Sequence, residues 1–337
     1  MTQMHTEAMQ SAWVVEQQLN HNQRAIEQAA ERIAQAKVVW TCARGSSDHA
    51  ALFLQYLLQS ECGIPAATAP PSIQSIYNRN VIQADHVMVA ISQSGHSPDL
   101  IRSAQSAKHA GAFVIAMVNT IASPLAELSD LVIDLRAGLE KSVAATKSFL
   151  ASLSASMQLA AAAGNVKSLE KSVEDLPNVL NEAATLDWFS QLEEAFTSCT
   201  SGLCIGRGIG LSAAEEIALK FKETSALHIE AFSSAEVQHG PMGLIKPEFP
   251  ILALVQPDNS QSSSIETALA LRQKGANVLI AANEPSVSNL PVPAQCDAYN
   301  ALPAMVLSTY LALSKLSVSL GYNPDTPPLL NKVTQTL

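Results

Sequence analysis

Short runs of apolar residues alternate with longer amphipathic stretches along the chain, and this alternation predicts the secondary structure. Buried parallel strands are short, continuously apolar and bounded by glycine or polar residues. Runs of this kind cover residues 38–42, 87–91, 112–118 and 131–135. Stretches with helical periodicity occupy residues 7–36, 49–58 and the segment from Pro98 onward. Strands that alternate with helices predict an α/β fold with a parallel sheet.

The second half of the chain repeats the first. Cys-Ala-Arg-Gly at 42–45 returns as Cys-Ile-Gly-Arg-Gly at 204–208, and the run at 109–115 returns at 273–279. The two offsets, 163 residues from Arg44 to Arg207 and 164 from Gly111 to Gly275, nearly agree. We therefore predict an internal duplication with a boundary between residues 164 and 187. The two predicted domains are residues 1–175 and 176–337.

Length and composition narrow the class of protein. A chain of 337 residues suits two domains. The formal net charge of −10 argues against a nucleic-acid partner. Only 15% of residues are charged, which favours an oligomer that buries part of its surface. Five cysteines without a C-x-x-C pair argue against disulfides and zinc. No export signal or membrane-length apolar segment is visible, so a cytoplasmic protein with no membrane partner is expected.

Serine-rich turns follow two of the predicted strands. Ser92-Gln93-Ser94-Gly95-His96-Ser97 joins the strand at 87–91 to the next helix, and Ser46-Ser47 follows the strand at 38–42. Ligands of parallel sheets bind at the carboxyl ends of strands, and helix N-termini favour anions. The alternative is that these serines merely cap helices. Since neither G-x-G-x-x-G nor a P-loop is present, a small sugar phosphate fits better than a nucleotide.

The second half carries the candidate acid–base groups. Glu216, Lys220 and Glu223 are spaced i, i+4 and i+7 and share one face of a predicted helix. The alternative is a solvated charge stripe, although the helix is otherwise apolar. His239 precedes a Gly-Pro turn. Lys332 lies in a tail with three nearby prolines, which predict an extended segment able to reach a cleft.

Taken together, these motifs resemble the sugar isomerase (SIS) domains, and specifically the isomerase half of glutamine–fructose-6-phosphate amidotransferase. The resemblance spans nearly the whole chain. It rests on ordered motifs at residues 45–50, 91–95, 140–147, 206–208, 218–223 and 236–241.

The resemblance implies two tandem SIS domains, each a flavodoxin-like parallel sheet between layers of helices. The first would carry the N-terminal helix and the phosphosugar loops. The second would carry the acid–base helix, the His-Gly-Pro loop and the lysine tail. It also implies a homodimer with active sites near the subunit interface, a phosphosugar substrate, and no metal or organic cofactor.

Site residues carry over by motif. Glu223 would move a proton between C-1 and C-2 of the sugar, as a carboxylate shielded from water can do. His239, often supplied by the neighbouring subunit, would open the ring, and Lys332 would meet the open chain. Substrate-binding roles would fall to Ser47, Ser92, Gln93, Ser94, Ser97, Val143, Ala144, Glu216 and Lys220.

Departures from the family pattern indicate the reaction. The amidotransferase begins with a glutaminase domain, whereas this chain begins MTQMHTEAM and enters the isomerase-like region at once. The tail has Pro328 where the family has arginine, and Gln238 replaces a lysine. We therefore expect glucosamine-6-phosphate deaminase activity, which converts that sugar and water to fructose 6-phosphate and ammonia. Alternatives are a fructosamine-6-phosphate deglycase, a galactosamine-6-phosphate deaminase and a non-catalytic phosphosugar sensor. The presence of Glu223, His239 and Lys332 together favours an enzyme over a sensor.

Overall fold

Two parallel β-sheets, each covered by helices, form the structure, which is a computed structural model that describes residues 1–332. The chain divides into two units that we name by their sheets. The five-stranded unit comprises Trp13–Glu140, Lys147–Glu174 and the tail from Asn331. The four-stranded unit comprises Met1–Ala12, Lys141–Thr146 and Asp175–Leu330. The domain boundary predicted at residue 175 stays a prediction, because each unit also includes short segments from elsewhere in the chain.

The five-stranded sheet has the order β2-β1-β3-β4-β5 with every pair of neighbours parallel. This is the flavodoxin-like strand order, and it confirms the predicted fold class. All residues of β3 are buried, as expected for a central parallel strand. The strands are β1 (Val39–Cys42), β2 (Ala66–Thr68), β3 (Val87–Ser92), β4 (Phe113–Val118) and β5 (Leu131–Asp134).

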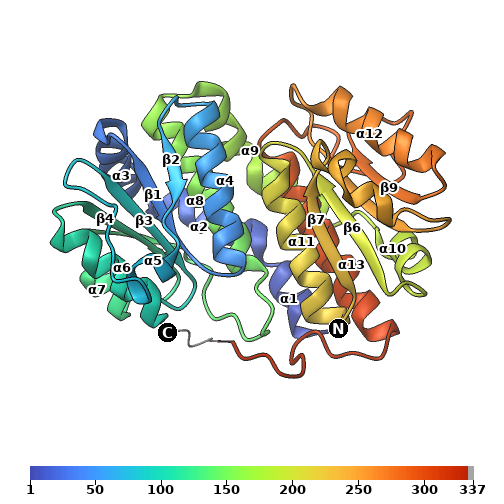
Figure 1. Ribbon diagram of the computed structural model, residues 1–337, viewed down its shortest axis with the longest axis horizontal. Helices are drawn as coiled ribbons and strands as arrows, with labels where there is room; N and C mark the ends of the chain where they lie inside the picture. Colours follow the sequence, from blue (N-terminus) through green and yellow to red (C-terminus); the bar gives the residue numbers. More distant parts are fainter. Residues whose placement is uncertain (333–337) are drawn as a thin grey trace. The chain divides into compact units, whose positions relative to one another are not determined.

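Helices cover both faces of this sheet (Figure 1). α3 and α4 pack against the almost wholly buried α8, while α6 contacts α5 and α7. α9 begins in this unit and ends in the other. The helices are α2 (Ser11–His21), α3 (Gln23–Gln35), α4 (Ser46–Ser60), α5 (Pro71–Ser75), α6 (Pro98–His109), α7 (Pro124–Leu128), α8 (Lys147–Gly164) and α9 (Lys167–Ala183).

The single helix predicted over residues 7–36 is wrong. Three helices occupy this stretch: α1 (Gln3–Ala8), α2 and α3. Side chains at the two breaks bond the backbone: Ser11 Oγ donates to the Ala8 carbonyl, and Asn22 Nδ2 donates to the Asp134 carbonyl. The local Ser11 bond competes with helical hydrogen bonds, whereas the Asn22 bond ties the second break to the end of β5. The apolar periodicity continues across both breaks, so periodicity alone does not reveal them.

The four-stranded sheet has the order β7-β6-β8-β9, again parallel throughout. Its order matches that of the first sheet without the last strand. β6, β8 and β9 begin about 163 residues after β1, β3 and β4, in agreement with the predicted duplication. The elements are β6 (Ser201–Gly206), β7 (His228–Ser233), β8 (Pro250–Val255), β9 (Asn277–Ala282), α10 (Phe189–Phe196), α11 (Gly210–Ser225), α12 (Gln261–Gln273), α13 (Ala301–Ser319) and the short 3₁₀ helices η1 (Glu236–His239) and η2 (Pro241–Leu244).

α13 is the central helix of the four-stranded unit. It packs against α1, α10 and α11. By length and composition it is apolar enough to cross a membrane, so the expectation that the chain has no apolar segment of membrane length is wrong. However, 89% of its most apolar window is buried inside the protein. Its apolar surface is therefore accounted for by core packing.

Candidate active site

The connections after β1 and β3 lie side by side, because these two strands pair directly. Gly45, with φ of +54°, turns the chain from β1 into α4. Arg44 in this turn donates to the fully buried Asp99 in the first turn of α6, through Nε at 2.9 Å and through a terminal nitrogen at 2.8 Å. This ion pair ties the first connection to the second.

Residues 92–97, which we call the serine loop, follow β3 and lead into α6. Ser92 Oγ accepts a hydrogen bond from the Gly95 N–H at 3.0 Å, and Gly95 has φ of +68°. Ser94 Oγ accepts from the His96 N–H at 3.3 Å. Both hydroxyls accept within the loop, so their own hydrogens remain free to donate to a ligand.

Several polar side chains of these two connections have no hydrogen-bond partner in the described part of the chain. Ser47, Gln93 and Ser97 make no side-chain hydrogen bond to any residue in the range 1–332, and all three are partly exposed. Ser97 occupies the N-cap position of α6 without capping it. Neutral donors at the start of two helices form a site suited to an anion. The structure thus places Ser47 in one connection and Ser92, Gln93, Ser94 and Ser97 in the neighbouring one. Their role in binding stays a prediction.

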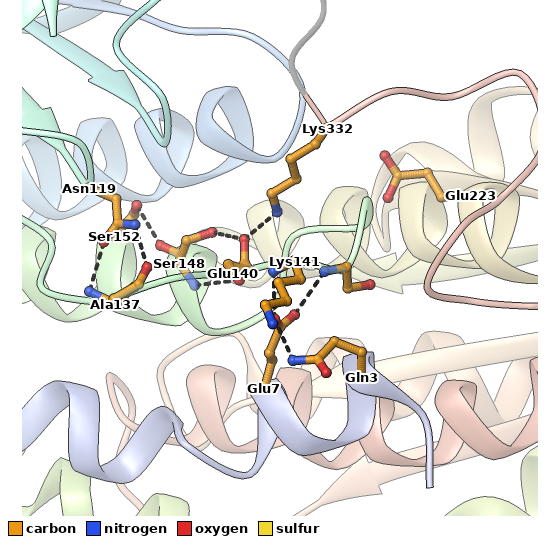
Figure 2. A network of polar contacts seen from close by, with 12 residues as sticks. Gln3, Glu7, Asn119, Ala137, Glu140, Lys141, Ser148, Ser152, Glu223 and Lys332 are labelled. Atoms are coloured by element: carbon orange, nitrogen blue, oxygen red, sulfur yellow. Dashed lines mark hydrogen bonds and ion pairs between the residues drawn. The ribbon is translucent and has the colours of Figure 1, made fainter.

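Lys332, also in the five-stranded unit, is paired with a carboxylate that the sequence analysis did not assign. Its Nζ lies 2.6 Å from Oε2 of Glu140, which is fully buried (Figure 2). The N–H and the hydroxyl of Ser148 donate to the two oxygens of Glu140 at 3.0 and 2.7 Å. Glu140 therefore holds both the start of α8 and the ammonium group of Lys332.

The charge of Glu140 is stabilised by these contacts. Burial alone would raise the pKa of its carboxyl group, but the Lys332 ammonium and the Ser148 hydrogen bonds lower the pKa below its ordinary value. Glu140 is thus a carboxylate at neutral pH. The chain from Gly321 to Lys332 forms neither helix nor strand, as the prolines predict.

In the four-stranded unit, α11 carries a buried charged cluster. Lys220 Nζ lies 3.2 Å from Glu216 Oε1 and 2.5 Å from Glu223 Oε2. The side chains of Glu216 and Lys220 are fully buried, whereas that of Glu223 is 21% exposed. Tyr310 on α13 donates its hydroxyl to Glu216 at 2.7 Å. The alternative of a solvated charge stripe is therefore wrong, and Glu223 is the member of the cluster that solvent reaches.

The two carboxylates determine the protonation of Lys220. Burial alone would lower the pKa of its ammonium group, but the charges and hydrogen bonds of Glu216 and Glu223 raise the pKa above its ordinary value. Lys220 is thus held as a cation. A fixed positive charge beside Glu223 orients that carboxylate and leaves its second oxygen for other contacts.

Val143 and Ala144 lie in a segment held by the carboxylate of Glu7 and the backbone carbonyl of Asp325, both in the same unit. Glu7 of α1 is buried and accepts from the backbone N–H groups of Lys141 at 2.6 Å and Ser142 at 3.2 Å (Figure 2). The Val143 N–H donates to the Asp325 carbonyl at 3.0 Å. α1 and the C-terminal segment therefore fix the backbone at 141–143.

His239 lies at the end of η1, directly before the Gly240-Pro241 turn that opens η2. Its side chain is exposed and makes no hydrogen bond or ion pair to residues 1–332. Within the same described range, no group of three or more potential ligand side chains could hold a metal ion.

Sequence reasoning missed Glu140, Tyr310, Glu7 and the Arg44–Asp99 pair. Glu140 lies inside a motif that we quoted, but its partner Lys332 is 192 residues away. Tyr310 stands in an otherwise apolar helix, with no local signal that its hydroxyl reaches α11. The spacing of Glu216, Lys220 and Glu223, by contrast, correctly predicted that they share one helix face.

Comparison with known proteins assigns the chain to one family, the SIS domain family. The SIS domain profile matches residues 32–162 and 196–290. A glutamine–fructose-6-phosphate aminotransferase (isomerizing) of Pseudomonas syringae pv. tomato is 33% identical over 328 residues, which cover 90% of this chain and 52% of that protein. The chain thus spans about half the length of the curated relatives it matches.

Solved structures show the same fold over nearly the whole chain. A protein of Silicibacter pomeroyi DSS-3, provisionally named a phosphosugar isomerase, is 34% identical with a TM-score of 0.88, and the match covers 96% of this chain and all of the other. The C-terminal domain of a glucosamine–fructose-6-phosphate aminotransferase from Francisella tularensis has a TM-score of 0.84 at 22% identity, covering 96% and 98% of the two chains. At that identity the second match supports the fold alone.

Proposed function

Because this chain belongs to the SIS domain family, we propose that it is an enzyme that isomerises sugar phosphates, and specifically a glucosamine-6-phosphate deaminase. The observation that carries the proposal is the α11 cluster, in which a buried lysine is held as a cation against the partly exposed carboxylate of Glu223. The relatives named above, with 33% and 34% identity, support the substrate class.

The phosphate group is assigned to the serine loop and Ser47. Their unpaired hydroxyl and amide donors, at the start of α4 and α6, can bind a dianion without a cationic side chain. Val143 and Ala144 are assigned to the sugar. The ion pair between Arg44 and Asp99 keeps the two phosphate-binding connections in register.

Proton transfer is assigned to Glu223. In the open-chain amino sugar, its carboxylate removes the proton from C-2, while the C-1 carbonyl oxygen gains a proton and an enolamine forms. Return of the proton to C-1 gives the imine of fructose 6-phosphate. Water adds to C-2 and ammonia leaves, which yields the ketose. The cation at Lys220 contacts the Glu223 carboxylate and orients it for the first step.

Two further side chains complete the proposed cycle. Exposed His239 is assigned to ring opening, in which it donates a proton to the ring oxygen as the bond from C-1 to that oxygen breaks and the C-1 hydroxyl loses its proton to water. Lys332 is assigned to the open chain, whose oxygen atoms an ammonium group can bind. Glu216 and Lys220 were expected to bind substrate, but both side chains are fully buried, so we assign them to positioning Glu223. Glu216 and Tyr310 act on Lys220 and are positioning residues.

An ammonia-release assay tests this function. Purified protein is incubated with glucosamine 6-phosphate, galactosamine 6-phosphate and a fructosamine 6-phosphate, and both ammonia and ketose 6-phosphate are measured. We expect turnover of glucosamine 6-phosphate, strong loss of it in Glu223→Gln, and no loss in the exposed control Glu230→Gln. Preference for another of these substrates would mean that the protein catalyses the reaction of that substrate and not glucosamine-6-phosphate deamination. Tight binding of a sugar phosphate without any turnover would support a sensor instead.

The proposal includes a homodimer. Two features support an interface between copies. Only 15% of the residues are charged, and three apolar side chains after α5 are exposed, namely Ile76, Tyr77 and Val81. Light scattering of the purified chain should give twice the mass of one chain, 35.7 kDa. A monomer at assay concentration that retains full activity would contradict the dimer.

A further inference from the structure

The hydroxyl of Ser123 is buried without a hydrogen-bond partner in the part of the chain that the structure describes. The side chain is 1% exposed. Ser123 directly precedes α7, where a serine commonly caps the first helical turn, yet it makes no capping hydrogen bond. Helix capping therefore does not explain the hydroxyl.

Ser123 faces the serine loop. A Cβ built on Gly95 would lie 2.1 Å from Ser123 Oγ, so the hydroxyl occupies the space beside the bare Cα of Gly95. Backbone bonds join the same two segments. Asn119 and Thr120 each donate an N–H to the Gln93 carbonyl at 3.2 Å, and Leu125 donates to the Gly95 carbonyl at 3.2 Å. The connection after β4 is therefore hydrogen-bonded to the backbone of the serine loop and packs against it.

Sheet order gives the direction of this support. β3 lies between β1 and β4. Ser123 follows β4, so it contacts the serine loop on the side opposite to Ser47, which follows β1. Ser123 therefore does not share the surface assigned to the phosphate group. It can act on the phosphate only through the loop.

An unpaired buried hydroxyl raises the free energy of the form that contains it, because the group has lost its bonds to water. Alanine at this position would avoid that penalty. A hydroxyl that gains a partner only after a ligand arrives has the opposite effect on the bound form. The free-energy difference between the ligand-free form, with its unpaired hydroxyl, and the bound form, with a paired one, then adds to the affinity for the ligand.

We propose that Ser123 is a positioning residue for the phosphate group, and that its hydroxyl hydrogen-bonds the backbone of the serine loop when the loop closes on the anion. This inference rests on the proposed function, since it takes the serine loop to be the phosphate site. It adds a residue outside that site which sets how tightly the site binds.

Substitution of Ser123 by alanine tests the inference, with Ser75→Ala as the matched control. Among the described residues of the five-stranded unit, Ser75 at the end of α5 has the other buried serine hydroxyl without a partner, and it does not lie at the serine loop. For each protein we would measure KM and kcat with glucosamine 6-phosphate, inhibition by inorganic phosphate, and thermal unfolding with and without phosphate.

In Ser123→Ala, KM and the inhibition constant for phosphate should both rise about five- to tenfold, the loss expected for one hydrogen bond, with kcat almost unchanged. The unfolding temperature without ligand should stay equal or rise, and its increase with phosphate should shrink. Ser75→Ala should show wild-type KM and inhibition. This combination separates a ligand-dependent bond from a structural one.

The opposite results are equally clear. Wild-type KM and inhibition in Ser123→Ala would overturn the inference, and so would a lower unfolding temperature with unchanged affinity. If phosphate inhibits the wild-type protein and Ser123→Ala equally and raises their unfolding temperatures equally, only the role of Ser123 is wrong. If the wild-type protein neither binds phosphate nor turns over any sugar phosphate, the proposed function fails and the inference fails with it.

Discussion

Lys332 places its ammonium group 2.6 Å from the buried carboxylate of Glu140, which in turn accepts two hydrogen bonds from Ser148. The contact fixes the last described residue of the chain to the start of α8. A lysine assigned to the substrate thus has a defined resting position inside the five-stranded unit.

Glu140→Gln should weaken this contact with little change of shape. The amide is neutral and has one acceptor oxygen in place of two, so either Lys332 or Ser148 loses a partner. We expect the free energy of unfolding to fall by about 1–3 kcal/mol and turnover to fall with it. Urea unfolding and the ammonia assay measure the two effects. Glu31→Gln, an exposed carboxylate on α3, is the control and should leave both unchanged. Wild-type stability and turnover in Glu140→Gln would show that the ion pair contributes nothing.

Stability should depend on pH at both ends of the scale. Glu140 has a pKa below its ordinary value near 4.5, so its contribution is complete above that pH and disappears as the pH falls through the lower folded value. Lys220 has a pKa above its ordinary value near 10.5, so its contribution is complete below that pH and disappears as the pH rises through the higher folded value. Thermal unfolding across the pH range would show both losses.

Glu140→Gln serves as the check on the acid side. If Glu140 causes part of the acid loss, the variant should show a shallower fall in unfolding temperature below about pH 4.5 than the wild type does. Equal acid slopes in the two proteins would assign the loss to other carboxylates.

Tyr310→Phe should expose the role of the α11 cluster. Removal of the hydroxyl takes one hydrogen-bond donor away from Glu216, whose side chain is fully buried. This loss should lower the free energy of unfolding by about 1–3 kcal/mol. If Glu216 positions Lys220 and through it Glu223, kcat should fall more than KM changes. Tyr322→Phe, at a side chain that is 42% exposed, provides the control. An unchanged kcat despite reduced stability would make Tyr310 purely structural.

Glu7→Gln should loosen the segment that carries Val143. The carboxylate accepts from Gln3, Lys141 and Ser142, and a glutamine amide would set an N–H group against one of these donors. We expect a loss of about 1–3 kcal/mol of stability and a higher KM for glucosamine 6-phosphate. Exposed Glu16→Gln is the matched control. A KM equal to that of the wild type would separate α1 from substrate binding.

The sheets were largely predictable because central parallel strands are buried on both faces and read as unbroken apolar runs, as β3 and β4 do. The edge strands β2 and β7 lack that signal. β2 has only three residues, and only one of the six residues of β7 is buried, so neither stands out in the sequence. The breaks at Ser11 and Asn22 depend on side-chain bonds to the backbone that periodicity does not record.

The candidate site was predictable where chemistry is local. The serine loop and the i, i+4, i+7 spacing on α11 are continuous in sequence. Contacts made by folding were not predictable: Tyr310 reaches Glu216 from 94 residues away, and Ser123 reaches Gly95 across two strand connections. These contacts depend on which elements pack together, which no local pattern contains.

Deuterium transfer from solvent tests the central claim, that Glu223 carries a proton between C-1 and C-2. The reaction with glucosamine 6-phosphate is run in D₂O, and the fructose 6-phosphate formed is examined by NMR. Since the side chain of Glu223 is 21% exposed, the proton that it takes from C-2 can exchange with solvent before a proton is returned to C-1. The account therefore predicts deuterium at C-1 with the wild-type protein, and neither ketose nor label with Glu223→Gln, although that variant still binds inorganic phosphate. Full turnover and the same labelling in Glu223→Gln would contradict the account.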